Sequence, residues 1–357
     1  MGKKTEISWT DATWNPVRGC SRVSAGCDNC YAMGVAHRFS NRAVQDPSGD
    51  RSLDKPAGPY HGLTTIRRGK VDWAGVARFI PEQLDAPLRW SKPRRIFVNS
   101  MSDLFHESLS NEEIAAVFGV MAACPQHTFQ VLTKRPKRAT EWFKWISARE
   151  TDLITAAELC GLDAQNEAYS ADLELGPLQP KLHGAPWPLP NVWLGVSAED
   201  QDTYNARLPM LVHQCPAAVH FVSLEPMLGP IKLRGTGHIH LDWVIIGGES
   251  GPGARPFDLS WARSLVGECA ESAIPCFVKQ LGARAIDSSL RDVNGYGYVH
   301  YTGAPGDARV LEAEKRHDYR VTPHDVTRLL ARDRRKGADM SEWEPALRIR
   351  EFPDARA

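Results

Sequence analysis

The sequence predicts an α/β protein whose strands form a parallel sheet. Runs that are apolar throughout, such as 192–197 and 243–247, alternate with helix-like stretches along much of the chain. Strands of this kind are buried on both faces, and helical crossovers connect them. The expected architecture is a full or partial parallel β/α barrel of the TIM-like type, with a doubly wound open sheet as the alternative.

The predicted elements follow one another in a regular order. A short first strand near 13–17 leads into a loop with three cysteines, and a helix covers 29–39. The capping box that starts at Ser110 begins a helix ending near residue 124, and another helix begins near Pro136. The remaining strands are expected at 95–99, 128–133, 192–197, 219–224, 243–247 and 275–279, and the remaining helices at about 200–213 and 259–272.

Two segments interrupt this order, and a third follows it. The segment from about 40 to 90 is polar and contains Gly and Pro, and the segment from about 155 to 190 has no clean period. We expect residues 1–283 to form the barrel, with these two segments as insertions. Residues 284–357 are expected to form a C-terminal extension.

The composition limits the classes of function. The chain has 357 residues, with 43 basic and 43 acidic ones, so its formal net charge is zero. Bulk charge alone therefore does not indicate a nucleic-acid-binding protein, because that mode needs concentrated Lys and Arg. No run approaches eighteen uninterrupted apolar residues, so we expect no membrane span, and a cytoplasmic location is expected because residues 1–6 do not resemble a signal peptide.

Three cysteines follow the first strand. Cys20, Cys27 and Cys30 lie on a single loop, separated by six residues and then two. Three thiolates can hold three irons of a four-iron cluster and leave the fourth iron open to a small molecule. The spacing therefore predicts an iron–sulfur cluster, [4Fe-4S], on this loop.

Other interpretations of the loop stay open. A structural zinc site could use the same cysteines with His37 as fourth ligand, although no second CxxC occurs in the sequence. A disulfide would need an oxidising compartment, and unligated thiols are a further alternative. The remaining cysteines are expected to fill the core: Cys124, Cys160, Cys215, Cys269 and Cys276.

Polar side chains follow nearly every predicted strand. In parallel β/α folds, ligands collect at the carboxyl ends of the strands, and the cysteine loop also follows a strand. We therefore expect one site next to the cluster. Its ring of polar residues is predicted to contain Asn99, Asp103, Lys134, Ser197, Glu199, Glu225, Glu249 and Lys279.

Such a ring suits a methionine-derived sulfonium cofactor. Its amine and carboxylate could chelate the open iron, and Glu199 or Glu225 could accept hydrogen bonds from its ribose hydroxyls. Ser197 or Asn99 could hold its amino-acid end. The full set expected to contact this cofactor is Asn99, Ser100, Asp103, Ser197, Glu199 and Glu225.

The ordered motifs along the chain carry a resemblance. They are the cysteine loop and residues 9–16, 97–103, 132–136, 192–199, 224–226, 247–251, 254–256, 279–280 and 342–353. With them the chain resembles the radical S-adenosylmethionine (radical SAM) superfamily and, more closely, a phage-associated family catalogued as phage proteins of unknown function. The first cysteine gap is longer than the superfamily's usual three residues, and Gly247-Gly248-Glu249 comes later than its usual counterpart, so its role could concern substrate.

The resemblance implies the chemistry. A [4Fe-4S] cluster, S-adenosyl-L-methionine (SAM) and an external electron donor would generate a 5′-deoxyadenosyl radical. The implied substrate is an amino-acid-decorated thymine in phage DNA, rearranged by an isomerase or otherwise modified in the host cytoplasm, with the base outside the stack. The residues expected at this substrate are Trp14, Asn15, Lys134, Glu249, Arg255 and Lys279.

Two other functions are compatible with the sequence. A radical SAM enzyme could act on a small molecule or peptide instead of DNA. A zinc-stabilised nucleic-acid-binding protein without catalysis would use the same cysteines as structural ligands. Metal content separates this last function from the first two.

Overall fold

A parallel sheet organises the protein. The computed structural model describes residues 5–40, 58–148, 187–233, 240–287, 337–340 and 343–353. Seven strands follow the order β1-β6-β7-β8-β9-β10-β12, and every pair of these strands with a defined register is parallel. The prediction of an α/β protein with a parallel sheet is confirmed. By its contacts the chain divides into two compact units, and β8 ends at the division.

The first unit contains the N-terminal strands and three helices. Its elements of the main sheet are β1 (Ala12–Trp14), β6 (Arg95–Val98), β7 (Thr128–Thr133) and β8 (Val192–Ser197), and its helices are α1 (Tyr31–Ser40), α2 (Asn111–Ala123) and α3 (Pro136–Ser147). The predicted capping box starts α2, because Glu113 N donates to Ser110 Oγ (3.1 Å) and Ser110 N donates to Glu113 Oε2 (2.8 Å). These strands and helices agree with the sequence prediction to within a few residues.

A small β-structure involves residues from the region of the cysteine loop and from the segment 58–89, where the sequence predicted only a polar insertion. Its elements are β2 (Val17–Arg18), β3 (Thr64–Arg67), β4 (Lys70–Trp73) and β5 (Arg78–Phe79), with 3-10 turns η1 (Ala25–Cys27), η2 (Pro81–Gln83) and η3 (Ala86–Arg89). Strands β3 and β4 form an antiparallel hairpin. Arg68 (φ 50°) and Gly69 (φ 75°) make its two-residue turn, the left-handed conformation that suits a tight hairpin.

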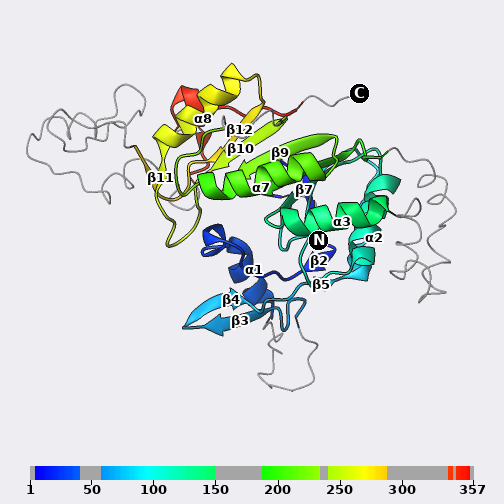
Figure 1. Ribbon diagram of the computed structural model, residues 1–357. Helices are drawn as coiled ribbons and strands as arrows, with labels where there is room; N and C mark the ends of the chain where they lie inside the picture. Colours follow the sequence, from blue (N-terminus) through cyan, green and yellow to red (C-terminus); the bar gives the residue numbers. More distant parts are fainter. Residues whose placement is uncertain are drawn as a thin grey trace, which may run out of the picture. The chain divides into compact units, whose positions relative to one another are not determined.

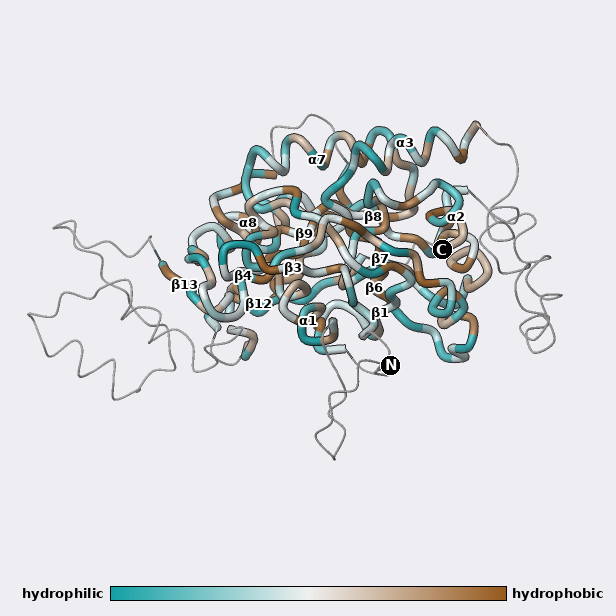
Figure 2. The backbone as a smooth tube through the Cα atoms, turned by 90° about the horizontal axis from the view of Figure 1, so that it is seen from below, coloured by the Kyte–Doolittle hydropathy of each residue, from teal (hydrophilic) through white to brown (hydrophobic). Residues whose placement is uncertain are grey.

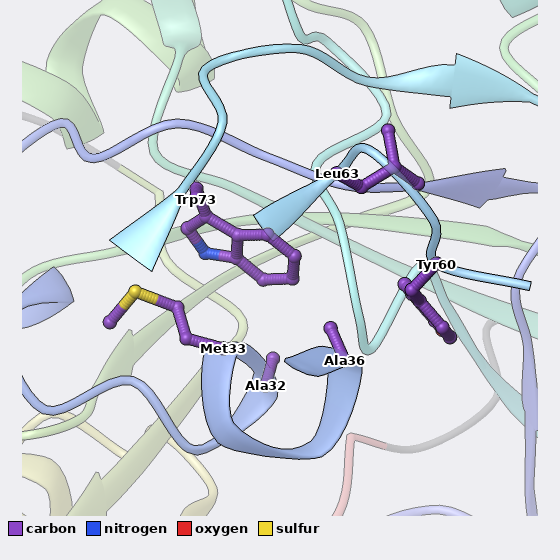
Figure 3. Packing of buried hydrophobic residues seen from close by; sticks show 6 residues of the cluster. All are labelled: Ala32, Met33, Ala36, Tyr60, Leu63 and Trp73. Carbon is purple, nitrogen blue, oxygen red and sulfur yellow. The ribbon is translucent and has the colours of Figure 1, made fainter. Parts of the chain in front are cut away.

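The hairpin packs against α1 and forms a core of its own. This hairpin core consists of Ala32, Met33, Ala36, Tyr60, Leu63 and Trp73. Figure 3 shows the Trp73 ring beside the small residues of α1, and Figure 1 shows α1 next to β3 and β4. Because Ala32 and Ala36 are four residues apart, they lie on one face of the helix, and their small size admits the indole ring. The hairpin is thus fixed to the helix that follows the cysteine loop.

The second unit contains the later strands. Its elements are β9 (Val219–Leu224), β10 (Trp243–Gly247), β11 (Phe257–Asp258), α8 (Leu259–Glu271), β12 (Cys276–Gln280), β13 (Ala285–Ile286) and η6 (Pro345–Leu347), together with most of α7 (Gln201–Gln214). Every residue of β10 is buried, as the apolar run predicts for a central parallel strand. The predicted helices at 200–213 and 259–272 correspond to α7 and α8.

The described part of the predicted C-terminal extension belongs to the second unit. Val278 N donates to Ile349 O (2.9 Å), and Glu351 N donates to Cys276 O (2.9 Å). The Phe352 ring lies 5.3 Å from that of Trp243. Most of the 284–357 extension and most of the 155–190 insertion lie outside the described residues, so the predicted domain boundaries stay a prediction.

Hydropathy follows burial along the backbone. The turns of α3 alternate between hydrophilic and hydrophobic residues in Figure 2, as expected for a helix with one buried face.

Among the described helices, none combines the length and the apolar character that crossing a membrane requires.

Candidate functional site

The cysteine loop connects β2 to α1 in the first unit. Cys20 comes two residues after β2, Cys27 ends η1, and Cys30 directly precedes α1. Backbone hydrogen bonds from Cys27 N to Ser24 O (2.9 Å) and from Cys30 N to Cys27 O (3.4 Å) fold the loop back on itself. Cys20 and Cys30 both pack against the hairpin core. The loop therefore brings two of its thiols to the same apolar surface.

Gly19 fixes the point where the chain enters the loop. Its φ of +86° lies in the left-handed region, and an added methyl group would overlap the carbonyl oxygen of Val76. A residue with a side chain would have to displace the backbone before β5. The position of Cys20 thus depends on a glycine directly before it.

Arg135 is a buried cation beside the loop. Its guanidinium donates to Cys20 Sγ (3.8 Å) and Asp103 Oδ2 (3.0 Å). It also donates to Ser21 Oγ (2.7 Å) and Glu107 Oε2 (3.0 Å). A guanidinium carries five N–H donors in a rigid plane, so one side chain can serve all four acceptors. Arg135 thereby ties the first cysteine to the segments that follow β6 and β7.

Asp103 holds the ends of β6 and β7 together. Its Oδ1 accepts hydrogen bonds from Thr133 Oγ1 (2.8 Å) and Phe105 N (3.0 Å), and its Oδ2 accepts from Lys134 N (3.0 Å) and Arg135. Donors of the protein thus occupy both carboxylate oxygens. The sequence predicted a cofactor contact for Asp103, and this stays a prediction; in the structure the residue positions Arg135.

Asn99 presents a buried amide directly after β6. The residue is 3% exposed and has a φ of +60°. Its Oδ1 accepts a hydrogen bond from Val17 N (3.3 Å). Within the described ranges, Asn99 Nδ2 has no hydrogen-bond acceptor. A buried donor without an acceptor costs about 1–3 kcal/mol, so this amide is well suited to a ligand oxygen.

The other predicted site residues near Asn99 are Asn15, Ser100 and Trp14, and they differ in their hydrogen-bond partners. Asn15 Oδ1 accepts hydrogen bonds from Ser100 Oγ (3.2 Å) and Met101 N (3.1 Å), so Asn15 and Ser100 lie together in the structure. Their predicted contacts, with the substrate and with the cofactor, stay predictions. Trp14 is 2% exposed, and its indole N–H donates to Gln83 O (2.7 Å). The indole of Trp14 is therefore part of the core in this structure.

Burial and nearby cations act in opposite directions on the thiols. Burial raises the pKa of Cys20 to about 12, and Arg135 opposes part of that rise. Burial likewise raises the pKa of Cys30, and the Lys134 ammonium lowers it. Buried thiols stay protonated unless a cation or metal stabilises the thiolate. The predicted residue Lys134 and its neighbour Arg135 are thus the cations that act on these two cysteines.

The three sulfurs influence one another without forming a closed metal site. A charge on Cys30 raises the pKa of Cys20, and a charge on Cys27 raises that of Cys30. In the part of the chain that the structure describes, no group of three or more His, Cys, Asp or Glu side chains is arranged to hold a metal ion. The thiols are neighbours that have not converged on one point.

His106 belongs to this network, and the sequence analysis missed it. Ser108 N donates to His106 Nδ1 (3.1 Å), so the ring proton is on Nε2, which lies 3.0 Å from Ser21 Oγ. Burial lowers the pKa of His106 and keeps the ring neutral. His106 could have been proposed as a site residue because it lies three residues after Asp103. Arg135 could have been proposed because it directly follows Lys134.

In the second unit, the predicted carboxylate after β8 meets an arginine. Glu199 is fully buried, and its Oε2 accepts a hydrogen bond from Arg207 Nη1 (3.1 Å). The same Arg207 nitrogen donates to Ser197 O (2.7 Å), and Ser197 Oγ donates to Glu225 O (3.2 Å). This part of α7 therefore binds back to the strand end that precedes it. The predicted ribose contact of Glu199 stays a prediction.

The loop after β10 contains a second, similar pair. Arg255 donates to both oxygens of Glu249, from Nη2 to Oε1 (2.6 Å) and from Nε to Oε2 (3.0 Å). Arg255 N donates to Oε2 as well (2.8 Å). The sequence predicted both residues as substrate contacts; the structure brings them together as a bidentate ion pair that closes the loop.

Glu225 and Lys279 form the third pair. Lys279 Nζ lies 2.9 Å from Glu225 Oε2, and Ser223 Oγ lies 3.4 Å from the same oxygen. The other oxygen, Oε1, is buried and has no hydrogen-bond donor among the described residues. An added methyl group at Gly247 would overlap Oε1. This buried carboxylate oxygen is therefore suited to accept a hydrogen bond from a ligand in the second unit.

The predicted ring thus consists of two groups. Asn99, Asp103 and Lys134 lie in the first unit with the cysteine loop, and the remaining five residues lie in the second unit. Within each unit, neighbouring members are brought together. The identity of the residues that contact a ligand stays a prediction.

Comparison with known proteins gives one match. Residues 4–336 match the family described as protein of unknown function (DUF5131). The chain belongs to this family. No curated protein and no solved structure matches it. The family description names no activity, so the function has to be argued from the residues.

Proposed function

We propose that this chain is a radical SAM enzyme in which Cys20, Cys27 and Cys30 hold a [4Fe-4S] cluster. The observation that carries the proposal is the cysteine loop with a buried guanidinium on its first sulfur. Three thiols occupy eleven residues, and Arg135 donates to Cys20 Sγ (3.8 Å). Hydrogen bonds to sulfur and the burial of the site are the features by which proteins tune such clusters.

The donor set fits the cluster. Thiolates are the ligands that iron–sulfur clusters use, and the raised pKa of Cys20 and of Cys30 means that a metal would have to displace their protons. Arg135 and Lys134 supply positive charge next to a site that becomes negative on ligation. When bound, the cluster would supply one electron to the sulfonium of SAM. The proposal requires the three sulfurs to converge when the cluster binds.

The residues of this chain would bind and orient the cofactor. In the first unit, Asn99 Nδ2 is a buried donor suited to the SAM carboxylate, and Ser100 lies next to it in sequence. Glu225 Oε1 is a separate buried acceptor in the second unit, and its predicted contact with ribose hydroxyls stays a prediction. Asp103 and Glu199 are engaged by Arg135 and Arg207, and we assign them to positioning.

The proposed substrate is a modified base in DNA. We take the chain to rearrange or otherwise modify an amino-acid-decorated thymine, inside the cytoplasm and with an external electron donor. The proposed architecture is a partial TIM-like barrel with the cluster loop after its first strand. The seven parallel strands support the barrel, and the resemblance of the motifs supports the substrate.

Reductive cleavage of SAM tests the proposal. The full chain, purified anaerobically and supplied with a strong reductant, is expected to release 5′-deoxyadenosine from SAM. Cys27→Ala is expected to abolish the release, because the cluster loses a ligand, whereas Cys215→Ala is expected to retain it, because Cys215 is buried against Thr140. No release by the unaltered chain, or equal release by both variants, contradicts the proposal.

A further inference from the structure

The residues around the cysteine loop carry a local excess of positive charge, which acidic residues elsewhere in the chain balance. The basic region is defined here as residues 15–40 and 58–80, which the structure describes and which include the cysteine loop, α1 and the hairpin. It contains seven basic and two acidic residues, in a chain whose net charge is zero. Residues 41–57 add three charges of each sign and leave the excess unchanged. The excess is therefore local, which the whole-chain composition conceals.

Both acidic residues of the basic region are ion-paired within it, and they share one arginine. Arg22 Nε lies 2.7 Å from Asp72 Oδ1, and Arg22 Nη1 lies 2.9 Å from Asp28 Oδ1. Within the described residues, no carboxylate forms an ion pair with the exposed hairpin cations Arg67, Arg68 and Lys70, although Arg67 helps to lower the pKa of Asp72. The surface thus keeps its positive charge.

Like charges face each other across both strand pairs of the region. Arg67 is directly opposite Lys70 in the hairpin, and Arg18 is directly opposite Arg78 in the β2–β5 pair. Like charges in these positions destabilise a sheet. The Arg18 guanidinium lies 5.6 Å from the centre of the Tyr60 ring, which relieves part of this repulsion. An anion bound between the members of each pair would remove it.

Apolar side chains are exposed on the same region. The described part of the chain has six large apolar residues with high exposure, and five of them are here: Val23, Tyr31, Phe39, Ile66 and Val76. Ile66 is the most exposed of them (63%) and directly precedes the hairpin cations. Positive charge interleaved with exposed apolar and aromatic side chains is typical of nucleic-acid surfaces, where phosphates meet the cations and bases stack on the rings.

We propose that the basic region binds nucleic acid through its phosphate backbone, with Arg67, Arg68 and Lys70 on the hairpin and Arg78 on β5 as phosphate contacts. The hairpin core fixes the three hairpin cations to α1 (Figure 3), and β5 pairs with β2, which directly precedes the cysteine loop. A strand bound here would be held next to the cysteines. That this region is the substrate surface of the enzyme rests on the proposed function. Its binding of DNA can be measured whether or not the enzyme assignment holds.

Fluorescence anisotropy of labelled DNA tests the inference. The full, anaerobically purified chain is titrated with a single-stranded oligonucleotide and with its duplex, without SAM or reductant. Arg67→Gln/Arg68→Gln/Lys70→Gln is expected to weaken binding about tenfold or more between about 50 and 200 mM salt. The slope of the logarithm of the binding constant against the logarithm of the salt concentration should become shallower by about two to three. Each lost phosphate contact removes up to about 0.9 from that slope.

A second triple variant controls for net charge. Lys92→Gln/Lys137→Gln/Lys144→Gln removes three exposed positive charges from the same unit, outside the basic region, and is expected to change the affinity less than about twofold. Arg78→Gln is an independent single variant with an expected loss of several-fold. Thermal unfolding checks that each variant is folded.

Three results overturn the inference. They are equal losses for the two triple variants, unchanged affinity in the hairpin variant, and binding to vesicles of anionic lipid without binding to either DNA. Failure of the proposed function has a different signature, because a chain that binds DNA through the hairpin without cleaving SAM retains this inference and loses only the enzyme assignment.

Discussion

The two groups of predicted site residues differ in how their charges are matched. Around the cysteine loop, Arg135 serves Cys20, Asp103, Glu107 and Ser21, so one cation faces an excess of acceptors. In the second unit each of the three predicted glutamates has one cation partner: Glu199 has Arg207, Glu249 has Arg255 and Glu225 has Lys279.

One-to-one ion pairing and a shared cation suit different roles. A one-to-one buried ion pair satisfies both partners and fixes a loop, which is what Glu199 with Arg207 and Glu249 with Arg255 do. A cation shared among several acceptors, one of them a sulfur, stabilises a site that gains negative charge on metal binding. A polar residue at a strand end is thus a poor predictor of ligand contact by itself. Whether such a residue is available to a ligand depends on which residue of the protein already pairs with its charge.

Removing the shared cation should have the largest effect. Arg135→Met leaves buried Asp103 without its cation, which is expected to cost about 3–5 kcal/mol of unfolding free energy. It also removes the donor to Cys20, so the iron content per chain should fall. Denaturant unfolding and iron determination measure the two effects. Lys137→Met, on the exposed side of α3, is the control and should change neither stability nor iron content. If Arg135→Met retains its full iron content, Arg135 does not support metal binding by the cysteine loop.

Removing a paired cation from the second unit should affect stability alone. Arg207→Met leaves fully buried Glu199 uncompensated, with an expected loss of about 3–5 kcal/mol in unfolding free energy. The iron content of the folded protein should stay unchanged, because the cysteines lie in the first unit. Lys232→Met, exposed in the second unit, is the matched control. If folded Arg207→Met loses iron, the ion pairs of the second unit are not independent of the cysteine loop, and the proposed difference between the two groups of site residues is wrong.

A smaller effect is expected at the glycine beside Glu225. Gly247→Ala would place a methyl group against Glu225 Oε1, and such overpacking costs about 1–3 kcal/mol. Gly267→Ala, on the open side of α8, should stabilise the protein by about 0.5–1 kcal/mol instead. Unfolding in denaturant measures both. If the two alanine variants are equally stable, the space around Glu225 is not as restricted as the geometry indicates.

The smallest effect concerns pH and a histidine away from the cysteines. His127 is buried, and desolvation lowers its pKa below about 6.5 in the folded state. The unfolded state therefore takes up the proton first, and stability is lost as the pH falls from about 6.5 through the folded-state pKa. The expected slope is at most about 1.4 kcal/mol per pH unit.

His127→Gln should make this part of the stability profile less steep, and His106, whose pKa burial also lowers, accounts for slope that remains. Unfolding free energies of the variant and the unaltered chain, measured across that pH range, give the comparison. A slope as steep in the variant as in the unaltered chain would assign the pH dependence to another group.

The strands and helices could be predicted from sequence because their signals are local. The run at Trp243–Gly247 is apolar throughout, and the capping box at Ser110 marks the start of α2. The hairpin was missed because β3 and β4 carry Thr, Arg and Lys in place of a regular apolar alternation. Its signal was the Arg68-Gly69 dipeptide between two short strands, which suits a turn with two positive φ angles.

The partners within the site could not be predicted in the same way. The residues that bind Arg135 come from the cysteine loop and from the segment after β6, and their proximity arises only when parallel strands align. By contrast, Arg255 lies six residues after Glu249 and Arg207 lies eight after Glu199, so these pairs form within one loop or one strand–helix turn. Sequence showed which residue types gather at the strand ends, and the fold shows which of them satisfy one another.

Iron and acid-labile sulfide determination on the full chain, purified anaerobically, tests the central claim most directly. The account predicts about four irons and four sulfides per chain, with a brown chromophore. About one zinc per chain, with no sulfide and no colour, would contradict it and make the cysteine loop a structural metal site.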